Sequence, residues 1–126
     1  MLKVFLIEDD EPLVALYKTA FELEGFAVEV AYDGQQAAQK LSSMVPKPDV
    51  ILLDIMMPKM NGFDFLKSIK DQKDPRQVLP VVVISNLAQQ PDIDKVMGLG
   101  ADLYLVKSQH DPQQIVEQVK LVLFKR

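Results

Sequence analysis

Five short apolar runs, separated by segments of helical spacing, constrain the fold more than any other feature of this sequence. The runs are nearly continuous and rich in β-branched residues, which is typical of strands buried on both faces rather than half-exposed strands. They cover residues 2–7, 27–31, 50–53, 81–84 and 103–106. We therefore predict five strands at these positions.

Amphipathic patterns fill the intervals between the runs. In the first interval, apolar residues recur in steps of three and four, which places them on one face of a helix; they are Leu13, Leu16, Tyr17, Ala20 and Leu23. The last interval has the same spacing at Ile115, Val119 and Val122, with Val116 and Leu123 alongside. Weaker patterns predict three further helices at about 34–44, 62–72 and 90–98.

Residues at the ends of these patterns indicate where the helices begin and end. Glu11-Pro12 and Asp111-Pro112 each combine an acidic cap with a proline, a common opening of a helix. Asn61 is expected to cap the helix that starts at Gly62, and Gly25 follows the first pattern, where a left-handed terminating residue belongs.

Strands that alternate with helices form a parallel sheet covered on both faces, so we predict a three-layer, doubly wound α/β fold. With 126 residues, 48% hydrophobic content and no visible linker or internal repeat, residues 1–126 are expected to form a single domain. In such sheets, ligands bind outside the carboxyl ends of the strands.

Composition excludes several classes of function. The chain has no cysteine, which rules out disulfides, zinc–thiolate sites and thiol catalysis, and its one histidine, His110, cannot form a histidine-based metal site alone. A net charge of −4 and the absence of a long basic run argue against nucleic-acid binding. No apolar stretch is long enough to span a membrane.

Polar residues follow four of the five predicted strands. Four acids, Glu8 to Glu11, follow the first strand, Asp54 follows the third, Ser85 the fourth and Lys107 the fifth. Because the carboxyl ends of parallel strands share one edge of the sheet, we expect these side chains to meet there.

The chemistry of such a set is narrow. Neighbouring carboxylates repel one another and therefore bind a proton or a cation, and oxygen-only ligands favour Mg²⁺ or Mn²⁺. A lysine and a serine can contact phosphoryl oxygens, and a carboxylate nucleophile can form an aspartyl phosphate. Taken singly, each residue has a structural explanation, such as a helix cap, a turn or an exposed lysine. Their occurrence at four strand ends in order favours a phosphoryl-binding site.

At these positions the chain resembles the receiver domains of two-component response regulators, over essentially its whole length. The motifs that carry the resemblance are Glu8-Asp9, Asp54 within Asp54-Ile-Met-Met-Pro58, Asn61-Gly62, Ser85, Gly100-Ala-Asp-Leu-Tyr104 and Lys107. The resemblance implies a flavodoxin-like sheet of order 2-1-3-4-5. It also implies a cytoplasmic signalling protein that turns over no separate substrate.

The resemblance further implies a role for each matched residue. Asp54 would accept a phosphoryl group from the phosphohistidine of a sensor histidine kinase or a histidine phosphotransfer protein. Magnesium (or manganese) would be held by Asp9, Asp54, the backbone carbonyl of Met56, and Glu8 either directly or through water. The alternative that the acidic pair is shifted by one residue, to include Asp10, stays open.

The remaining matched residues are implied to transmit the signal. Lys107 and Ser85 would contact the phosphoryl group, and Tyr104 would change rotamer on activation. A downstream protein would then bind the face formed by the fourth and fifth strands and the helices that follow them. Whether phosphorylation drives homodimerisation is left open.

Two features depart from the family pattern. Ser108 follows Lys107 where the family usually has a proline after a cis peptide bond; because a non-proline cis bond costs roughly 2.5–4 kcal/mol, we expect a trans bond and a different course for this loop. Asn86 and Leu87 replace the small and polar pair often found after the hydroxyl residue. Apolar Met56 and Leu87 are expected to restrict the attacking water.

Three alternatives stay open at this point. The chain could be a pseudo-receiver that binds partners without being phosphorylated, or a receiver excised from a longer DNA-binding regulator. It could also be a hydrolase of the haloacid dehalogenase type, although those enzymes usually need a second aspartate where Met56 stands.

Overall fold

The computed structural model describes residues 1–57, 61–71, 78–87 and 89–124. Pro58 of the motif after the third strand, and residue 72 at the end of the predicted third helix, lie outside these ranges.

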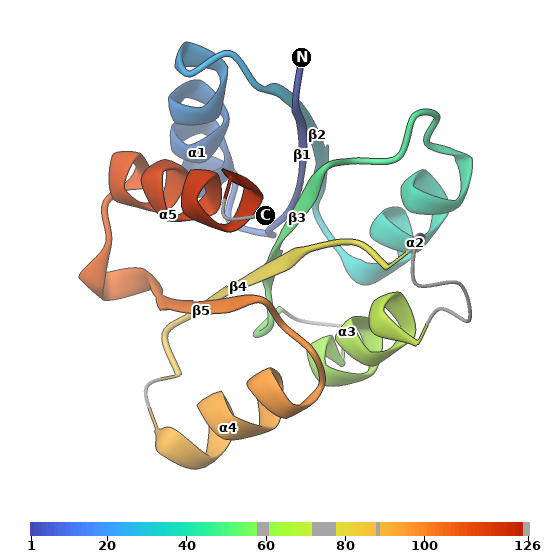
Figure 1. Ribbon diagram of the computed structural model, residues 1–126, viewed down its shortest axis with the longest axis vertical. Coiled ribbons are helices and arrows are strands. Elements are labelled where there is room, and N and C mark those ends of the chain that lie inside the picture. The colour runs from blue at the N-terminus through green and yellow to red at the C-terminus, as the bar shows by residue number, and fades with distance from the viewer. Residues whose placement is uncertain (58–60, 72–77, 88, 125–126) are drawn as a thin grey trace.

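One sheet of five parallel strands runs through the molecule in the order β2-β1-β3-β4-β5 (Figure 1). The strands are β1 (Lys3–Ile7), β2 (Ala27–Ala31), β3 (Val50–Asp54), β4 (Val81–Ser85) and β5 (Leu103–Val106). The predicted parallel α/β fold and its strand order are confirmed. β1 begins one residue later than predicted, and β3 and β4 each end one residue later, so Asp54 and Ser85 are the last residues of their strands.

Helices cover both faces of the sheet, as Figure 1 shows. They are α1 (Glu11–Leu23), α2 (Gly34–Ser43), α3 (Gly62–Lys70), α4 (Gln90–Gly98) and α5 (Pro112–Phe124). Val4 and Leu6 of β1 pack in the core beneath α1 and α5, whereas Phe5 and Ile7 pack in the core beneath α2, α3 and α4. This burial on both faces explains why the strands lack polar–apolar alternation. Among the described helices, none has the length and apolar character that a membrane crossing requires.

The helix caps agree with the sequence at three ends and correct it at one. Asp10, rather than Glu11, caps α1: its carboxylate accepts from the N–H of Leu13 at 3.1 Å, and Glu11 is the first helical residue. Asn61 caps α3 through the N–H of Asp64. At α5, Asp111 and Gln114 form a reciprocal capping box, in which each side chain accepts from the other's backbone N–H. Gly25, just after α1, has a φ of 89° as expected.

The buried face of α1 matches the predicted one at Tyr17 and Ala20 and differs from it at Leu16 and Leu23. Leu16 and Leu23, expected in the core, are 57% and 81% exposed, and the buried side chains include Val14, Tyr17 and Phe21. Two apolar stripes with steps of three and four overlap in this helix, one residue apart. Spacing alone could not decide which stripe faces the sheet.

The register of the sheet brings the strand ends into line. Ile7 of β1 lies beside residue 31 of β2, Asp54 of β3 beside Ile84, and Ser85 of β4 beside Val106 of β5. The residues that leave β1, β3, β4 and β5 therefore share one edge, where the sequence placed the candidate site.

Candidate functional site

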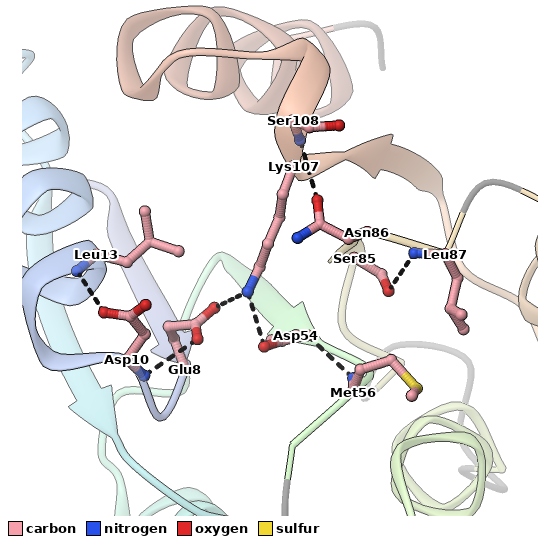
Figure 2. A network of polar contacts seen from close by, with 10 residues as sticks. All are labelled: Glu8, Asp10, Leu13, Asp54, Met56, Ser85, Asn86, Leu87, Lys107 and Ser108. Atoms are coloured by element: carbon pink, nitrogen blue, oxygen red, sulfur yellow. Dashed lines mark hydrogen bonds and ion pairs between the residues drawn. The ribbon is translucent and has the colours of Figure 1, made fainter.

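Lys107 joins two carboxylates from other strands at this edge (Figure 2). Its Nζ lies 2.7 Å from Oε2 of Glu8 and 2.9 Å from Oδ2 of Asp54. Glu8 follows β1, Asp54 ends β3 and Lys107 follows β5. The structure therefore brings together three of the predicted site residues from distant parts of the chain.

Asp54 is held by contacts at both carboxylate oxygens. Its Oδ1 accepts from the N–H of Met56 at 3.0 Å, its Oδ2 accepts from Lys107, and the residue is only 2% exposed. Gly62 allows the start of α3 to lie against the segment after Asp54, because a Cβ at position 62 would lie 2.3 Å from the carbonyl oxygen of Ile55. The glycine of the Asn61-Gly62 motif thus lets α3 begin close to the segment that follows Asp54.

Glu8 is a fully buried acid. Its Oε1 accepts from the N–H of Asp10 at 3.2 Å, whereas its Oε2 is paired with Lys107 by charge without the alignment of a hydrogen bond. Burial raises the pKa of Glu8 to about 7; the charge of Asp54 adds to this rise and Lys107 opposes it.

Lys107 keeps its charge at neutral pH. Burial alone would lower its pKa, but the paired carboxylates of Glu8 and Asp54 outweigh burial and raise the pKa above the usual value. The peptide bond between Lys107 and Ser108 is trans, as expected, and residues Lys107–Gln109 form a short 3₁₀ turn. This course of the loop still carries the lysine amine to Asp54.

The carboxylates of Glu8, Asp9 and Asp54 form a set that fits a hard divalent cation. Each offers an oxygen, and the three oxygens lie within 4.8 Å of one another. Oxygen-only donors of this kind suit Mg²⁺ or Mn²⁺. Within the described residues this cluster does not include Asp10, whose carboxylate caps α1. The pair Glu8-Asp9 is thus favoured over a pair shifted by one residue.

Ser85 and Tyr104 are connected through the backbone of Leu87. The buried hydroxyl of Ser85 accepts from the N–H of Leu87 at 3.1 Å, and the hydroxyl of Tyr104 donates to the carbonyl of Leu87 at 2.6 Å. Burial raises the pKa of Tyr104, while the neighbouring Ser85 hydroxyl opposes the rise. Ser85 thus bonds to its own loop here, and its predicted contact with a phosphoryl group stays a prediction.

Sequence reasoning assigned no role in the site to two residues that lie near it. Tyr17 of α1 is buried, which raises its pKa to about 12, and it also lies within electrostatic reach of Lys107, Glu8 and Asp54. Asn86 accepts a hydrogen bond from the backbone of Ser108 at 3.1 Å (Figure 2). The signal for Asn86 was present in the sequence, since both Asn86 and Ser108 depart from the family pattern.

Known proteins resemble this chain over most of its length. The family model described as the response regulator receiver domain matches residues 4–120. The transcriptional regulatory protein CpxR of Escherichia coli K12 is 41% identical over 125 residues, which are 98% of this chain and 50% of CpxR. The chain therefore spans about half the length of this curated relative.

Two solved structures are similar over nearly their whole length. The receiver domain of the Francisella response regulator 1452 has a TM-score of 0.87 and 28% identity, with 99% of this chain and 98% of that chain covered. The Mn²⁺-bound form of response regulator Rcp1 has a TM-score of 0.81 and 25% identity, with 96% and 93% covered.

Proposed function

We propose, from the premise that this chain belongs to the response regulator receiver-domain family, that Asp54 accepts a phosphoryl group from a phosphohistidine. The family resemblance inferred from the sequence is confirmed, and the chain is a receiver domain of two-component signalling. The observation that carries the proposal is the placement of Lys107 against the buried carboxylates of Glu8 and Asp54.

The proposed reaction transfers a phosphoryl group from a histidine nitrogen of the donor to a carboxylate oxygen of Asp54. A carboxylate oxygen of Asp54 forms a bond to phosphorus, the phosphorus–nitrogen bond breaks, and its electron pair stays on the imidazole of the donor. Lys107 neutralises charge on the phosphoryl oxygens, and the Met56 N–H keeps the Asp54 carboxylate oriented. Positioning and charge neutralisation account for the catalysis of such a transfer.

Glu8, Asp9 and Asp54 would hold the divalent cation, with the backbone carbonyl of Met56 as a further proposed ligand. When bound, Mg²⁺ or Mn²⁺ supplies positive charge to the phosphoryl oxygens. This assignment rests on the three converging carboxylates, and Mn²⁺ is the ion named for the similar Rcp1 structure.

Phosphorylation is proposed to act on the contacts of Leu87. A phosphoryl group adds roughly −1.5 to −2 charge at neutral pH, which would draw the hydroxyl of Ser85 toward it. Ser85 and Tyr104 both bond to the backbone of Leu87, on either side of its Cα, so movement of Ser85 would disturb the Tyr104 hydrogen bond and the adjoining surface of α4, β5 and α5. We propose this surface as the binding face for a downstream protein or for a second copy of the chain.

The partners and setting follow from the same proposal. The donor would be a sensor histidine kinase or a histidine phosphotransfer protein, in the cytoplasm, and residues 1–126 would act as one domain without contacting nucleic acid directly. CpxR is named a transcriptional regulatory protein and is about twice as long. The alternative that this chain is the receiver of a longer DNA-binding regulator therefore stays a proposal as well.

Phosphorylation of Asp54 can be tested by mass. The wild type, Asp54→Asn and Asp10→Asn would each be incubated with a small acyl phosphate and Mg²⁺ and weighed intact. We expect one added phosphoryl group on the wild type and on Asp10→Asn, because asparagine also caps helices well, and none on Asp54→Asn. Equal labelling of Asp54→Asn would place the acceptor elsewhere, and no labelling of the wild type would favour a pseudo-receiver.

The hydrolase alternative is disfavoured. Met56, which is 56% exposed, stands where the second aspartate of such enzymes is needed, and the family match is to receiver domains. We accordingly propose that the chain promotes only its own phosphorylation and dephosphorylation.

A further inference from the structure

The two departures from the receiver pattern lie in contact with each other. The side-chain oxygen of Asn86 accepts a hydrogen bond from the backbone N–H of Ser108 at 3.1 Å, across 22 positions of the chain (Figure 2). Each residue belongs to a loop that leaves the sheet at the candidate site. We call this contact the Asn86–Ser108 latch.

The latch depends on both departures at once. A proline at position 108 would have no N–H to donate. A glycine or alanine at position 86 would have no side-chain oxygen to accept. Either of the residues usual in the family would therefore abolish the contact.

The latch also lies where it can influence the reactive groups. Ser85 and Val106 are the last paired residues of β4 and β5, so the sheet's own pairing of these strands ends there. Asn86 comes directly after Ser85, and Ser108 directly after Lys107. The latch therefore connects the segments after β4 and β5 beyond Ser85 and Val106, the last pair of the two strands.

From these contacts we infer that Asn86 is a positioning residue, which holds the turn after β5 so that the Lys107 amine stays between Glu8 and Asp54. The lysine side chain is long and flexible, so the place of its amine depends on the backbone that carries it. A proline would restrict that backbone through its ring. Here residues Lys107–Gln109 form a 3₁₀ turn without proline, and the latch fastens this turn to the β4 loop.

This inference rests on the proposed function and predicts a split between two binding reactions. Lys107 would contact phosphoryl oxygens, whereas the cation would be held by Glu8, Asp9 and Asp54. Loosening the turn should weaken binding of a phosphoryl group without weakening binding of the cation. Disruption of the whole site would weaken both.

The test uses four variants of the full chain. Asn86→Ala removes the acceptor, Ser108→Pro removes the donor, the double variant removes both, and Ser108→Ala keeps the N–H as the matched control. Two affinities are measured for each: that for beryllofluoride, a phosphoryl analogue, at saturating Mg²⁺, and that for Mn²⁺ alone. The amide-proton signal of residue 108 is followed by NMR where the amide is present.

We expect Asn86→Ala to move the Ser108 amide signal and to weaken beryllofluoride binding roughly three- to tenfold, the effect of losing about one hydrogen bond. Its affinity for Mn²⁺ should not fall, and Ser108→Ala should match the wild type. In the Ser108→Pro background, Asn86→Ala should have no further effect, because the bond is already absent.

Three results would overturn the inference. They are an unmoved Ser108 amide signal in Asn86→Ala, an unchanged beryllofluoride affinity in that variant, and a loss of beryllofluoride affinity on Asn86→Ala that is equal in the wild-type and Ser108→Pro backgrounds. Failure of the proposed function looks different, since the wild type itself would then not bind beryllofluoride. In that case the position of Lys107 is read from the NMR signal of its Cε, which depends on pairing with Glu8 and Asp54. A signal identical in wild type and Asn86→Ala would again overturn the inference.

Discussion

The amine of Lys107 lies 2.9 Å from Oδ2 of Asp54, although the two residues are 53 positions apart. The same amine lies 2.7 Å from Oε2 of Glu8. One lysine thus balances two buried carboxylates, and the proposed cation site and the proposed phosphoryl site share these charged groups.

Replacing Lys107 by methionine should destabilise the metal-free protein. The variant leaves Glu8 and Asp54 buried without their cation, and breaking a buried pair in this way costs about 3 kcal/mol. Added Mg²⁺ should restore much of the loss and should stabilise the variant more than the wild type. Urea unfolding with and without Mg²⁺ measures both effects. Lys120→Met, which breaks an exposed pair with Glu24, serves as the control and should change stability little.

The stability of the metal-free protein should depend on pH through Glu8. Burial raises the pKa of this acid from 4.5 to about 7, so between these values the folded state binds more protons than the unfolded state. The contribution of Glu8 to the free energy of unfolding is therefore greatest below pH 4.5. It falls by up to about 3 kcal/mol as the pH rises to about 7. The difference in unfolding free energy between the wild type and Glu8→Gln, followed across this range, isolates the contribution. A difference that does not vary with pH would contradict it.

Polar residues at positions 56 and 87 should shorten the life of the phosphorylated form. Met56 is 56% exposed beside Asp54, and Leu87 is half-buried beside Ser85. A polar side chain there could hydrogen-bond the water that attacks phosphorus. We expect Met56→Asn with Leu87→Gln to raise the rate of dephosphorylation roughly two- to tenfold, the effect of about one hydrogen bond. Loss of the phosphoryl group over time, followed by intact mass, measures the rate; an unchanged rate would show that these side chains do not restrict the water.

Asp102 should contribute to stability without contributing to phosphorylation. Its Oδ2 accepts from the N–H of Val81, where β4 begins, and from the amine of Lys70, each at 2.7 Å. These contacts lie at the opposite end of β4 from Ser85. We expect Asp102→Ala to cost roughly 1–3 kcal/mol, because it leaves a part-buried N–H and a lysine without their acceptor.

The control for this prediction is Asp102→Asn, which keeps an acceptor oxygen for Val81 and should lose less stability. Urea unfolding compares the variants, and labelling by a small acyl phosphate compares their activity. Slower labelling of folded Asp102→Ala would show that this end of the sheet does influence the site.

The sequence alone determined the architecture, because burial produces local patterns of apolar residues. A strand buried on both faces is a continuous apolar run, and a helix buried on one face has apolar residues in steps of three and four. The continuous apolar runs located all five strands to within one residue at either end, and the helix caps at Asn61 and Asp111 could be read from residue type. Candidate site residues could be listed because acids, a serine and a lysine follow strands whose carboxyl ends share one edge. The strand order came from the family resemblance.

Only the tertiary structure decided which of these residues meet and what each contacts. Four consecutive acids follow β1, and it is their position on the turn into α1 that separates buried Glu8 from Asp10, which caps the helix. Two overlapping stripes on α1 became distinguishable only once the helix lay on the sheet. The Asn86–Ser108 latch joins two loops whose separation depends on the pairing of β4 with β5. Spacing along a chain records local periodicity, whereas contacts between distant segments depend on how the whole sheet is assembled.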